Sequence, residues 1–268
     1  SSIKKRLTVS DVPVGVLLSG GLDSSLIVAI SSKHVSKDIN TYSIGFTDRE
    51  SEQGNEFYYS DIIAEQFKTN HSKIVTNDDE LYSSLDSVIQ MMPEPLSGQD
   101  AAGFFLLAKK VSETQKVVLS GQGADELFGG YFWYNKMVSN EANDIDVFTN
   151  NYIDRSFSDY QMMINKKYAN KDHANRLINN WFSEYQKEDM SFLDTVLRID
   201  VSNLIVDDPV KRVDSMTMAW ALETRVPFLD KDLVEFLLTI PSKMKIESNG
   251  KYFLKKISLV KYLPNEYY

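Results

Sequence analysis

The sequence predicts an α/β fold: a parallel sheet of about five strands with helices on both faces, followed by a mostly helical lobe. Over roughly the first 130 residues, apolar runs of strand length alternate with segments of helical period, which is typical of parallel strands joined by crossover helices. Glycine-bearing polar turns follow the first and fourth apolar runs. Because ligands of such sheets bind beyond the carboxyl ends of the strands, we expect both turns to face one crevice. After about residue 131 strand-like runs largely disappear.

Composition narrows the class of protein. The 268 residues are 43% hydrophobic, which is enough for one large domain or two modest ones. The formal net charge is −9, so the chain as a whole repels nucleic acid and anionic membrane, and we expect neither as a partner. No apolar run approaches the roughly twenty residues that span a bilayer, and the start lacks a signal-peptide core, so we expect a cytoplasmic protein. The absence of cysteine excludes disulfides, thiolate metal sites and cysteine nucleophiles.

The individual elements follow from hydrophobic periodicity and from the residues that interrupt it. Pro13 precedes the first strand, a polar stretch at residues 48–55 is a loop, and Pro93-Glu94-Pro95 ends a helix. Strands are expected at residues 14–18, 41–46, 71–75 and 116–121. Helices are expected at residues 2–7, 26–30, 59–67, 79–91 and 100–113.

Two of these helices carry further expectations. The helix at residues 79–91 is expected to turn its apolar side chains inward, namely Leu81, Leu85, Val88, Ile89 and Met92. The helix at residues 100–113 is apolar on more than one face, so we expect it to lie buried between layers. In the second lobe, helices are expected at residues 147–155, 160–167, 192–204, 210–222, 230–238 and 251–260. Residues 140–180, rich in Asn, Asp and Lys, should form the loosest region.

Residues 14–30 form the first informative stretch, a strand followed by a loop and a helix. Gly20 and Gly21 let an anion approach the backbone, and the N–H groups at the helix start supply a positive dipole. The hydroxyls of Ser19, Ser24 and Ser25 can donate to phosphate oxygens, and the Asp23 carboxylate can hold Mg²⁺. The alternative is an ordinary Gly-Ser turn in which Ser24 or Asp23 caps the helix. No Gly-Lys-Ser/Thr follows, so this is not a Walker loop.

Residues 120–131 form the second informative stretch. Gly121 and Gly123 let the backbone approach a ligand closely, and Asp125 follows a strand end as Asp23 does. Two carboxylates that converge from different strand ends suit an Mg²⁺ ion carrying a polyphosphate, so we expect Asp23 and Asp125 to be metal ligands. The alternative makes Asp125 and Glu126 an acidic pair at a helix N-terminus. The role of Glu126 stays open between the site and the buried structure.

The string Ser-Gly-Gly-Leu-Asp-Ser-Ser at residues 19–25 resembles the pyrophosphate loop of the ATP pyrophosphatase (PP-loop) superfamily, with its adenine nucleotide alpha hydrolase-like fold. Further strings narrow the resemblance to the synthetase domain of the glutamine-dependent asparagine synthetases, over most of the chain from near Val14 to Lys251. These strings are Tyr42–Phe46, Glu94-Pro95, Ser120–Tyr131, Val213–Ala219, Leu222–Asp230 and Gly250–Tyr252. The resemblance implies one such domain over residues 1–268, with a nucleotide-binding α/β part at 1–130 and a helical part at 131–268 that completes the site.

The resemblance also implies a reaction and a set of site residues. In this family a carboxylate attacks the α-phosphorus of ATP, pyrophosphate leaves, and ammonia then displaces AMP to form an amide. The cofactors it implies are ATP and Mg²⁺. By the same resemblance, pyrophosphate and its magnesium are bound by Ser19, Gly20, Gly21, Asp23, Ser24 and Ser25. The adenine is flanked by Leu17 and Ile44, and the nucleotide or acyl group touches Ser120 and Gly121. Lys251 lies beside the phosphates. The alternative for Lys251 is a solvated lysine in a turn.

Two departures from the family pattern bear on function. The family's glutaminase half uses an amino-terminal cysteine, which this chain lacks, so we expect it to use free ammonia or a glutaminase domain of a longer native chain. Many asparagine synthetases carry Glu where this chain has Gln122. A carboxylate there can take a proton from ammonia, whereas an amide only orients it by hydrogen bonding. The related β-lactam synthetases place Tyr at this position, which argues against that branch.

The sequence therefore predicts an ATP-dependent, amide-forming ligase with aspartate as the first candidate substrate. Amidation of a peptide or another small acid is the next candidate, and a nucleotide-binding regulatory protein without catalysis is a third. A nucleic-acid-modifying ATP pyrophosphatase is disfavoured by the acidic balance. The oligomeric state is open, a homodimer included.

Several polar residues outside the two loops receive no single assignment. Asp214, Glu223 and Arg225 either reach the crevice or form an internal ion-pair network. The three histidines, His34, His71 and His173, fit no metal or triad spacing, so none is assigned a catalytic role.

Overall fold

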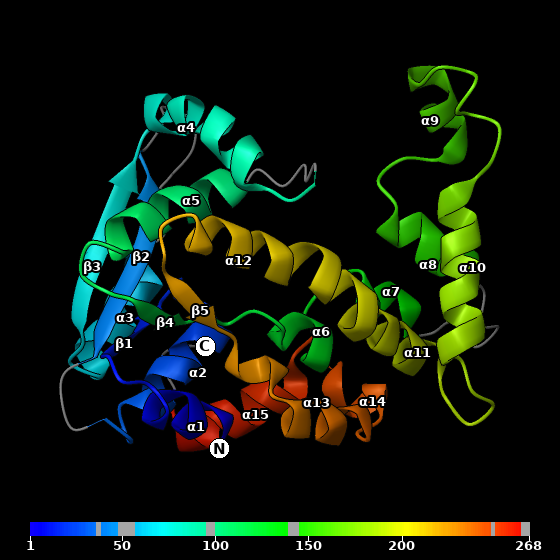
Figure 1. Ribbon diagram of the computed structural model, residues 1–268. Coiled ribbons are helices and arrows are strands. Elements are labelled where there is room, and N and C mark those ends of the chain that lie inside the picture. The colour runs from blue at the N-terminus through cyan, green and yellow to red at the C-terminus, as the bar shows by residue number, and fades with distance from the viewer. Residues whose placement is uncertain (36–38, 48–56, 95–99, 139–144, 248–249, 264–268) are drawn as a thin grey trace. The chain divides into compact units, whose positions relative to one another are not determined.

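The computed structural model describes residues 1–35, 39–47, 57–94, 100–138, 145–247 and 250–263 (Figure 1). Its internal contacts divide the chain into two compact units. Unit 1 comprises Ser1–Ala124, Ile205–Val234 and Lys255–Tyr268, and unit 2 comprises Asp125–Leu204 and Glu235–Leu254. The division is thus not a single cut near residue 130, because two later segments return to unit 1. The loop expected at residues 48–55, together with Pro95, lies outside the described residues.

Unit 1 contains a five-stranded parallel sheet in the order β3-β2-β1-β4-β5, which confirms the predicted fold class. The strands are β1 Val14–Leu17, β2 Asn40–Phe46, β3 Asn70–Thr76, β4 Val117–Leu119 and β5 Glu223–Arg225. The first four lie where the apolar runs predict them. The fifth was not identified as a strand, because Glu-Thr-Arg contains no apolar run. Its pairing with β4, Val117 beside Glu223, makes it a strand.

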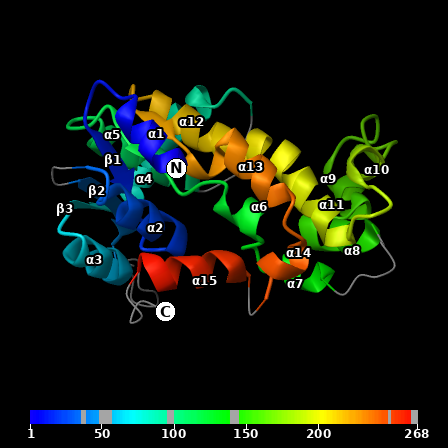
Figure 2. The ribbon, with the colours of Figure 1, turned by 90° about the horizontal axis from the view of Figure 1, so that it is seen from below.

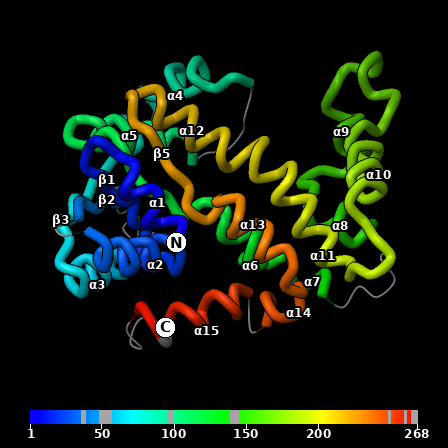
Figure 3. The backbone as a smooth tube through the Cα atoms, turned by 60° about the horizontal axis from the view of Figure 1, so that its bottom comes forward, coloured from blue at the N-terminus to red at the C-terminus, as the bar shows by residue number. Residues whose placement is uncertain are grey.

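Helices cover both faces of this sheet (Figure 2). On one face lie α2 Leu22–Ser31 and α3 Phe57–Gln66, and α1 Ser2–Thr8 packs beside α2 (Figure 3). On the other lies α5 Asp100–Val111, which contacts β2 and β3 on one side and α4 Asp78–Met91 and α12 Lys211–Met218 on the other. Helix α5 is therefore buried between layers, as its apolar faces predict. Among the described helices, none has both the length and the apolar character needed to cross a membrane.

Helix α4 corrects one prediction about its inner face. Val88 is buried as expected, but Leu85 and Ile89 are 41% and 69% exposed. The inner face instead carries Leu81, Ser84 and Val88, spaced three and four residues apart along one side of the helix. Leu85 and Ile89 each follow this stripe by one position, so the helical rotation of about 100° turns them outward.

Unit 2 is helical, as predicted for the second lobe. Its helices are α6 Ala124–Phe128, α7 Tyr134–Met137, α8 Ile145–Tyr152, α9 Phe157–Met163, α10 His173–Tyr185, α11 Phe192–Ile199 and α14 Ser242–Lys245. A π-helical turn, Asp200–Leu204, continues α11, and a second, Val206–Val210, precedes α12. The remaining elements are the 3₁₀ turn Pro227–Leu229, α13 Lys231–Leu238 and α15 Tyr252–Lys261.

Helix α10 lies within the region that the composition predicts to be loose. Asp172 caps it by accepting a hydrogen bond from the backbone N–H of Asn175. Its buried side chains are only Ile178 and Phe182, four residues apart. The helix was not predicted because this stripe is narrow and the other positions are mostly polar, so tertiary packing rather than local periodicity stabilises it.

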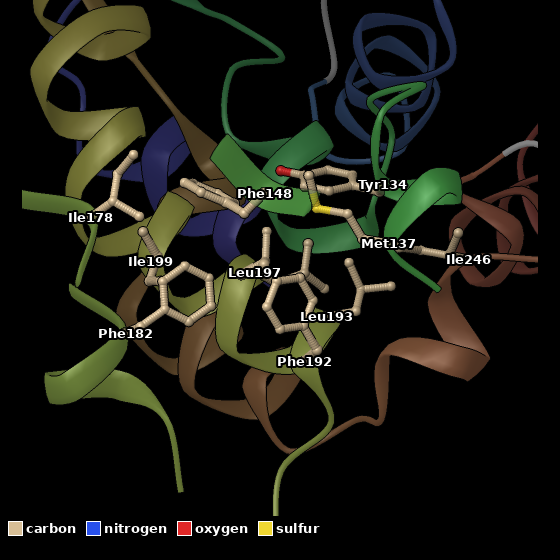
Figure 4. Packing of buried hydrophobic residues seen from close by; sticks show 11 residues of the cluster. Tyr134, Met137, Phe148, Ile178, Phe182, Phe192, Leu193, Leu197, Ile199 and Ile246 are labelled. Carbon is tan, nitrogen blue, oxygen red and sulfur yellow. The ribbon is translucent and has the colours of Figure 1, made fainter. Parts of the chain in front are cut away.

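The core of unit 2 is an aromatic and aliphatic cluster (Figure 4). Phe182 is 2% exposed; its ring stacks on Phe192 at 5.2 Å between centroids and meets Phe148 edge to face at 5.4 Å. Such ring pairs add stabilisation beyond the area that they bury. The other buried members are Tyr134, Met137, Ile178, Leu193, Val196, Leu197, Ile199 and Ile246.

This packing predicts the effect of deleting the central ring. Phe182→Ala should lower the free energy of unfolding of unit 2 by about 3–5 kcal/mol, because it removes buried surface and leaves a cavity. Urea unfolding followed by tryptophan fluorescence measures it, since Trp133 and Trp181 both pack against the cluster. Met162→Ala is the control, since Met162 is 79% exposed and its loss should cost less than about 0.5 kcal/mol. Equal costs for the two variants would contradict this packing.

Candidate functional site

The first loop connects β1 to α2 in unit 1. Gly20 has φ +83°, and a Cβ atom there would lie 2.7 Å from the backbone nitrogen of Ser60 and 2.8 Å from the Cβ atom of Tyr59. Only glycine therefore fits against the start of α3. Gly21 is the N-cap of α2 and makes no side-chain cap hydrogen bond. Neither Asp23 nor Ser24 is therefore the N-cap of α2, which was the alternative for these residues. The first turn of α2 has backbone N–H groups that make no hydrogen bond to an N-cap side chain.

The hydroxyls of this loop differ in exposure. Ser19 is exposed, whereas Ser24 and Ser25 are 5% and 0% exposed. The Oγ atoms of Ser19 and Ser24 lie 3.1 Å apart within hydrogen-bond distance, and the Ser24 hydroxyl donates to the carbonyl of Gly21. The loop is therefore braced from within, and the Ser19 hydroxyl is the one that faces solvent. Leu17 is buried at the end of β1 and belongs to the same apolar cluster as the half-buried Ile44.

The second loop follows β4 and contacts the first loop inside unit 1. A Cβ atom on Gly121 would lie 3.1 Å from the Cβ atom of Asp23 and 3.3 Å from the backbone nitrogen of Ser24. Ser120 is 4% exposed and its N–H donates to the carbonyl of Arg225 in β5. Gln122 is half-buried. The chain therefore brings the loops after the first and fourth strands together, because β1 and β4 are neighbours in the sheet.

Two predicted site residues of unit 2, Asp125 and Lys251, form an ion pair. The Lys251 Nζ atom lies 2.8 Å from Oδ1 of Asp125, and the two side chains are 14% and 33% exposed. Lys251 has φ +51°, a left-handed conformation that a residue with a Cβ adopts at a cost. The pairing excludes the alternative of a solvated lysine. The strained backbone at this position is a signal that no sequence pattern predicts.

Glycines allow this ion pair to form. A Cβ atom on Gly130 would collide with Oδ1 of Asp125 and with Cε of Lys251, and one on Gly250 would lie 2.5 Å from the carbonyl oxygen of Gly129. Gly129 and Gly250 have φ +67° and +82°. The turn after α6 and the turn before α15 thus pack backbone against backbone, and this contact holds the lysine beside the carboxylate.

Glu126 lies in the interior of unit 2. It is 1% exposed and its Oε1 accepts a hydrogen bond of 2.7 Å from the Tyr131 hydroxyl. Burial raises the pKa of the Glu126 carboxyl. A second buried carboxylate, Asp200, accepts a 2.5 Å hydrogen bond from the Tyr134 hydroxyl, and burial raises its pKa to about 7. Of the two roles left open for Glu126, its burial and bonding support the structural one.

The polar residues near α12 form ion pairs within unit 1. Arg212 lies 3.0 Å from Asp100 and 3.1 Å from Asp208, and Lys211 pairs with Glu94. Arg225 bonds Glu223 at 2.6 Å and donates to the carbonyl of Arg6. These contacts support the ion-pair alternative for Glu223 and Arg225, while Asp214 is exposed.

The predicted site residues thus fall into two described groups. Unit 1 brings together Leu17, Ser19, Gly20, Gly21, Asp23, Ser24, Ser25, Ile44, Ser120, Gly121 and Gln122. Unit 2 brings together Asp125 and Lys251. Within the described residues, no three His, Asp or Glu side chains gather into a metal-binding group. Each group contains one predicted metal ligand, Asp23 in unit 1 and Asp125 in unit 2, and a carboxylate oxygen is a donor of the kind that Mg²⁺ accepts.

Comparisons with known proteins agree on one family. The family model described as asparagine synthase matches residues 1–268. Asparagine synthetase [glutamine-hydrolyzing] 3 of Bacillus subtilis is 29% identical over 281 residues, covering 97% of this chain and 44% of the relative. A probable asparagine synthetase of Schizosaccharomyces pombe is 30% identical over 292 residues, covering 99% and 43%. This chain spans less than half the length of these relatives.

A solved structure shows only a low likeness. It is a tRNA thiolase from Methanococcus maripaludis with a [4Fe-4S] cluster, 14% identical, with a TM-score of 0.36 over 82% of this chain and 75% of the thiolase chain.

The packed glycine turns generate a stability prediction. Gly130→Ala should lower the free energy of unfolding by at least about 1 kcal/mol, because the new Cβ atom displaces the Asp125–Lys251 pair. Gly103→Ala in α5 is the matched control: its Cβ atom would meet nothing closer than Phe46 Cζ at 3.7 Å, so helix propensity should stabilise it by about 0.5–1 kcal/mol. Urea titration of both variants tests the opposite signs, and two stabilised variants would refute the predicted collision.

The buried carboxylate predicts a pH dependence. The pKa of Asp200 is raised from 3.8 to about 7 in the folded chain, so its contribution to stability is complete below about pH 4 and is lost as the pH rises through 7. Between pH 5 and pH 8 the free energy of unfolding should therefore fall by roughly 2 kcal/mol. Asp200→Asn should make this slope shallower, whereas the exposed Asp79→Asn should leave it unchanged. Equal slopes in urea unfolding of wild type and Asp200→Asn would count against the raised pKa.

Proposed function

The chain belongs to the asparagine synthase family, and on that basis we propose that it is the synthetase part of an ATP-dependent, amide-forming ligase. Aspartate is the substrate we favour. The ammonia would come from glutamine through a glutaminase domain of the native protein, in keeping with relatives more than twice as long as this chain. The compartment we propose is the cytoplasm, where ATP and aspartate are available.

The proposed reaction has two steps. A carboxylate oxygen of the substrate attacks the α-phosphorus of ATP, the bond from that phosphorus to the bridging oxygen breaks, and pyrophosphate leaves. The nitrogen of ammonia then attacks the acyl carbon of the resulting acyl-AMP, the bond from that carbon to the AMP oxygen breaks, and the nitrogen loses a proton. The protein's task is to hold anions that repel one another and to stabilise the charge that grows on the departing oxygen.

The observation that carries the proposal is the loop between β1 and α2. The exposed Gly21 leaves its backbone open to an anion, and Gly20 packs the loop against α3. No N-cap side chain bonds the helix that follows, and the Ser19 hydroxyl is exposed beside Gly21. This combination suits pyrophosphate, which the loop and the hydroxyls of Ser19, Ser24 and Ser25 would bind. The buried Leu17 and half-buried Ile44 would flank the adenine, and Ser120 and Gly121 would contact the nucleotide or the acyl group.

Asp23 and Asp125 are the residues we propose to hold Mg²⁺. When bound, the ion would neutralise phosphate charge. Lys251 would contribute a positive charge to the departing pyrophosphate, and its ion pair with Asp125 and its strained backbone support a role that fixes its position. Gln122 would orient ammonia by hydrogen bonding, since an amide cannot take the proton.

The reaction class can be tested by exchange of labelled pyrophosphate into ATP. A panel of carboxylic acids is supplied one at a time, with ammonia added in separate reactions. Exchange stimulated by aspartate alone is expected. Stimulation by a peptide or another acid would redirect the substrate assignment and keep the reaction, and nucleotide binding without exchange for any acid would favour a regulatory protein.

Two substitutions test the roles of the charged residues. Asp23→Asn and Lys251→Met should each reduce the exchange rate by at least about 100-fold, because each removes a charge that acts on the phosphates. Asp79→Asn and Lys243→Met are the matched controls: Asp79 is the second residue of α4 as Asp23 is of α2, and Lys243 is an exposed lysine of unit 2. Circular dichroism confirms folding of all four variants. Wild-type exchange in Asp23→Asn or Lys251→Met would remove that residue from the proposed machinery.

A further inference from the structure

A chain of hydrogen-bonding side chains crosses the sheet of unit 1 and ends at the first loop. The Thr69 and Thr41 hydroxyls lie 2.7 Å apart, and the Thr41 hydroxyl lies 2.9 Å from Nδ1 of His71. The other ring nitrogen of His71, Nε2, lies 3.4 Å from the Ser43 hydroxyl. Ser43 donates to the carbonyl oxygen of Leu18. The contacts run from the edge strand β3 through β2 to the residue that follows β1.

One placement of the hydrogen atoms gives every contact in this series a donor and an acceptor. Burial lowers the pKa of His71, with Asp61 of α3 and Lys73 of β3 as the charged groups that face it, so the ring is neutral near pH 7. Nδ1 then accepts from Thr41, and the Nε2 hydrogen points to Ser43. Ser43 in turn uses its own hydrogen for the Leu18 carbonyl. Asp61 lies 4.0 Å from Nε2, beyond hydrogen-bond distance, so it does not compete for this hydrogen.

The series of hydrogen bonds ends at the Leu18 carbonyl, between strand β1 and the first loop. β1 ends at Leu17, and the N–H of Leu18 still bonds the carbonyl of Tyr42 in β2. Leu18 is 1% exposed, so its carbonyl has no ready access to water and needs a donor from the protein. The Ser43 side chain, 4% exposed, supplies that donor. The next peptide leads into Ser19 and Gly20, so the orientation of the Leu18 carbonyl sets the entry to the loop.

We propose that Ser43 and His71 are positioning residues for the pyrophosphate loop, with His71 orienting the Ser43 hydroxyl and Ser43 fixing the Leu18 carbonyl. This inference rests on the proposed function, because it assigns the two residues an effect on anion binding. Neither side chain touches the substrate. Their effect is to keep the loop backbone in the one orientation that directs the N–H groups of α2 at the anion, so that binding requires no rearrangement.

The first test compares two buried serines. Ser43→Ala should weaken the binding of inorganic pyrophosphate with Mg²⁺ by about tenfold, because the Leu18 carbonyl loses the hydrogen bond from Ser43 and the loop relaxes. Ser84→Ala is the matched control, since Ser84 is equally buried at 6% and its hydroxyl bonds the Leu81 carbonyl within α4. Calorimetric titration of the full chain gives both affinities, and the melting temperatures report any general loss of stability.

The second test separates positioning from packing. His71→Gln keeps an N–H donor that can reach Ser43, whereas His71→Ala removes it, so the glutamine variant should bind pyrophosphate close to wild type and the alanine variant several-fold more weakly. His34→Ala, at an exposed position, should have no effect. Equal affinity in wild type, Ser43→Ala and His71→Ala would overturn the inference. So would equal weakening by His71→Gln and His71→Ala, because packing alone would then explain the loss.

The outcomes also separate this inference from the proposed function. If the wild-type chain binds neither pyrophosphate nor ATP, the proposed function fails first. If wild type binds pyrophosphate and the Ser43 and His71 variants bind it equally well, only the positioning role is lost. Should Ser43→Ala fail to fold, the His71→Gln and His71→Ala pair still decides the question.

Discussion

Both groups of site residues are built where one stretch of backbone packs directly against another. Gly20 lies against the start of α3, Gly121 against Asp23, and Gly250 against the Gly129–Gly130 turn. A Cβ atom at Gly20 or Gly250 would collide with backbone atoms at 2.7 and 2.5 Å, and one at Gly121 would lie 3.1 Å from Cβ of Asp23. Because no side chain separates these backbones, their N–H groups and the neighbouring carboxylates are fixed by the packing of helices and strands rather than by flexible side chains.

The chain is acidic, and it would bind a polyanion with few cations of its own. Residues 14–31, which contain the first loop, include no lysine or arginine. The loop therefore depends on backbone dipoles and hydroxyl groups, which stabilise an anion without carrying net charge and do so independently of pH. In the function we propose, net neutralisation of phosphate would come from Lys251 and from a cation held by Asp23 and Asp125.

The sequence predicts the first four strands of unit 1 well because β1 and β4 are buried apolar runs, and β2 and β3 keep recognisable strand patterns between polar segments. It does not identify β5, because these three residues become a strand only by pairing with β4. It also does not predict that Leu85 and Ile89 are exposed, because the buried face of α4 depends on where α5 packs. The family strings mark Lys251, but its left-handed backbone follows from a glycine contact distant in sequence. His71 was assigned no role, because its partners on β2 come from a register that no local pattern encodes.

The ion pair between Lys251 and Asp125 places a limit on how these two residues can act. A carboxylate has two oxygens with about four acceptor positions, and the pair uses one oxygen, Oδ1, so Oδ2 is the oxygen left to serve a cation. An ammonium group carries three hydrogens, and in this ion pair it faces Oδ1 of Asp125. The pair is therefore compatible with both proposed roles and also orients the lysine before any anion arrives. A lysine without this partner would lose the conformational freedom of its side chain only when an anion binds, and that loss would weaken binding. In this chain the ion pair with Asp125 restricts the Lys251 side chain during folding, so the cost is not incurred again on binding.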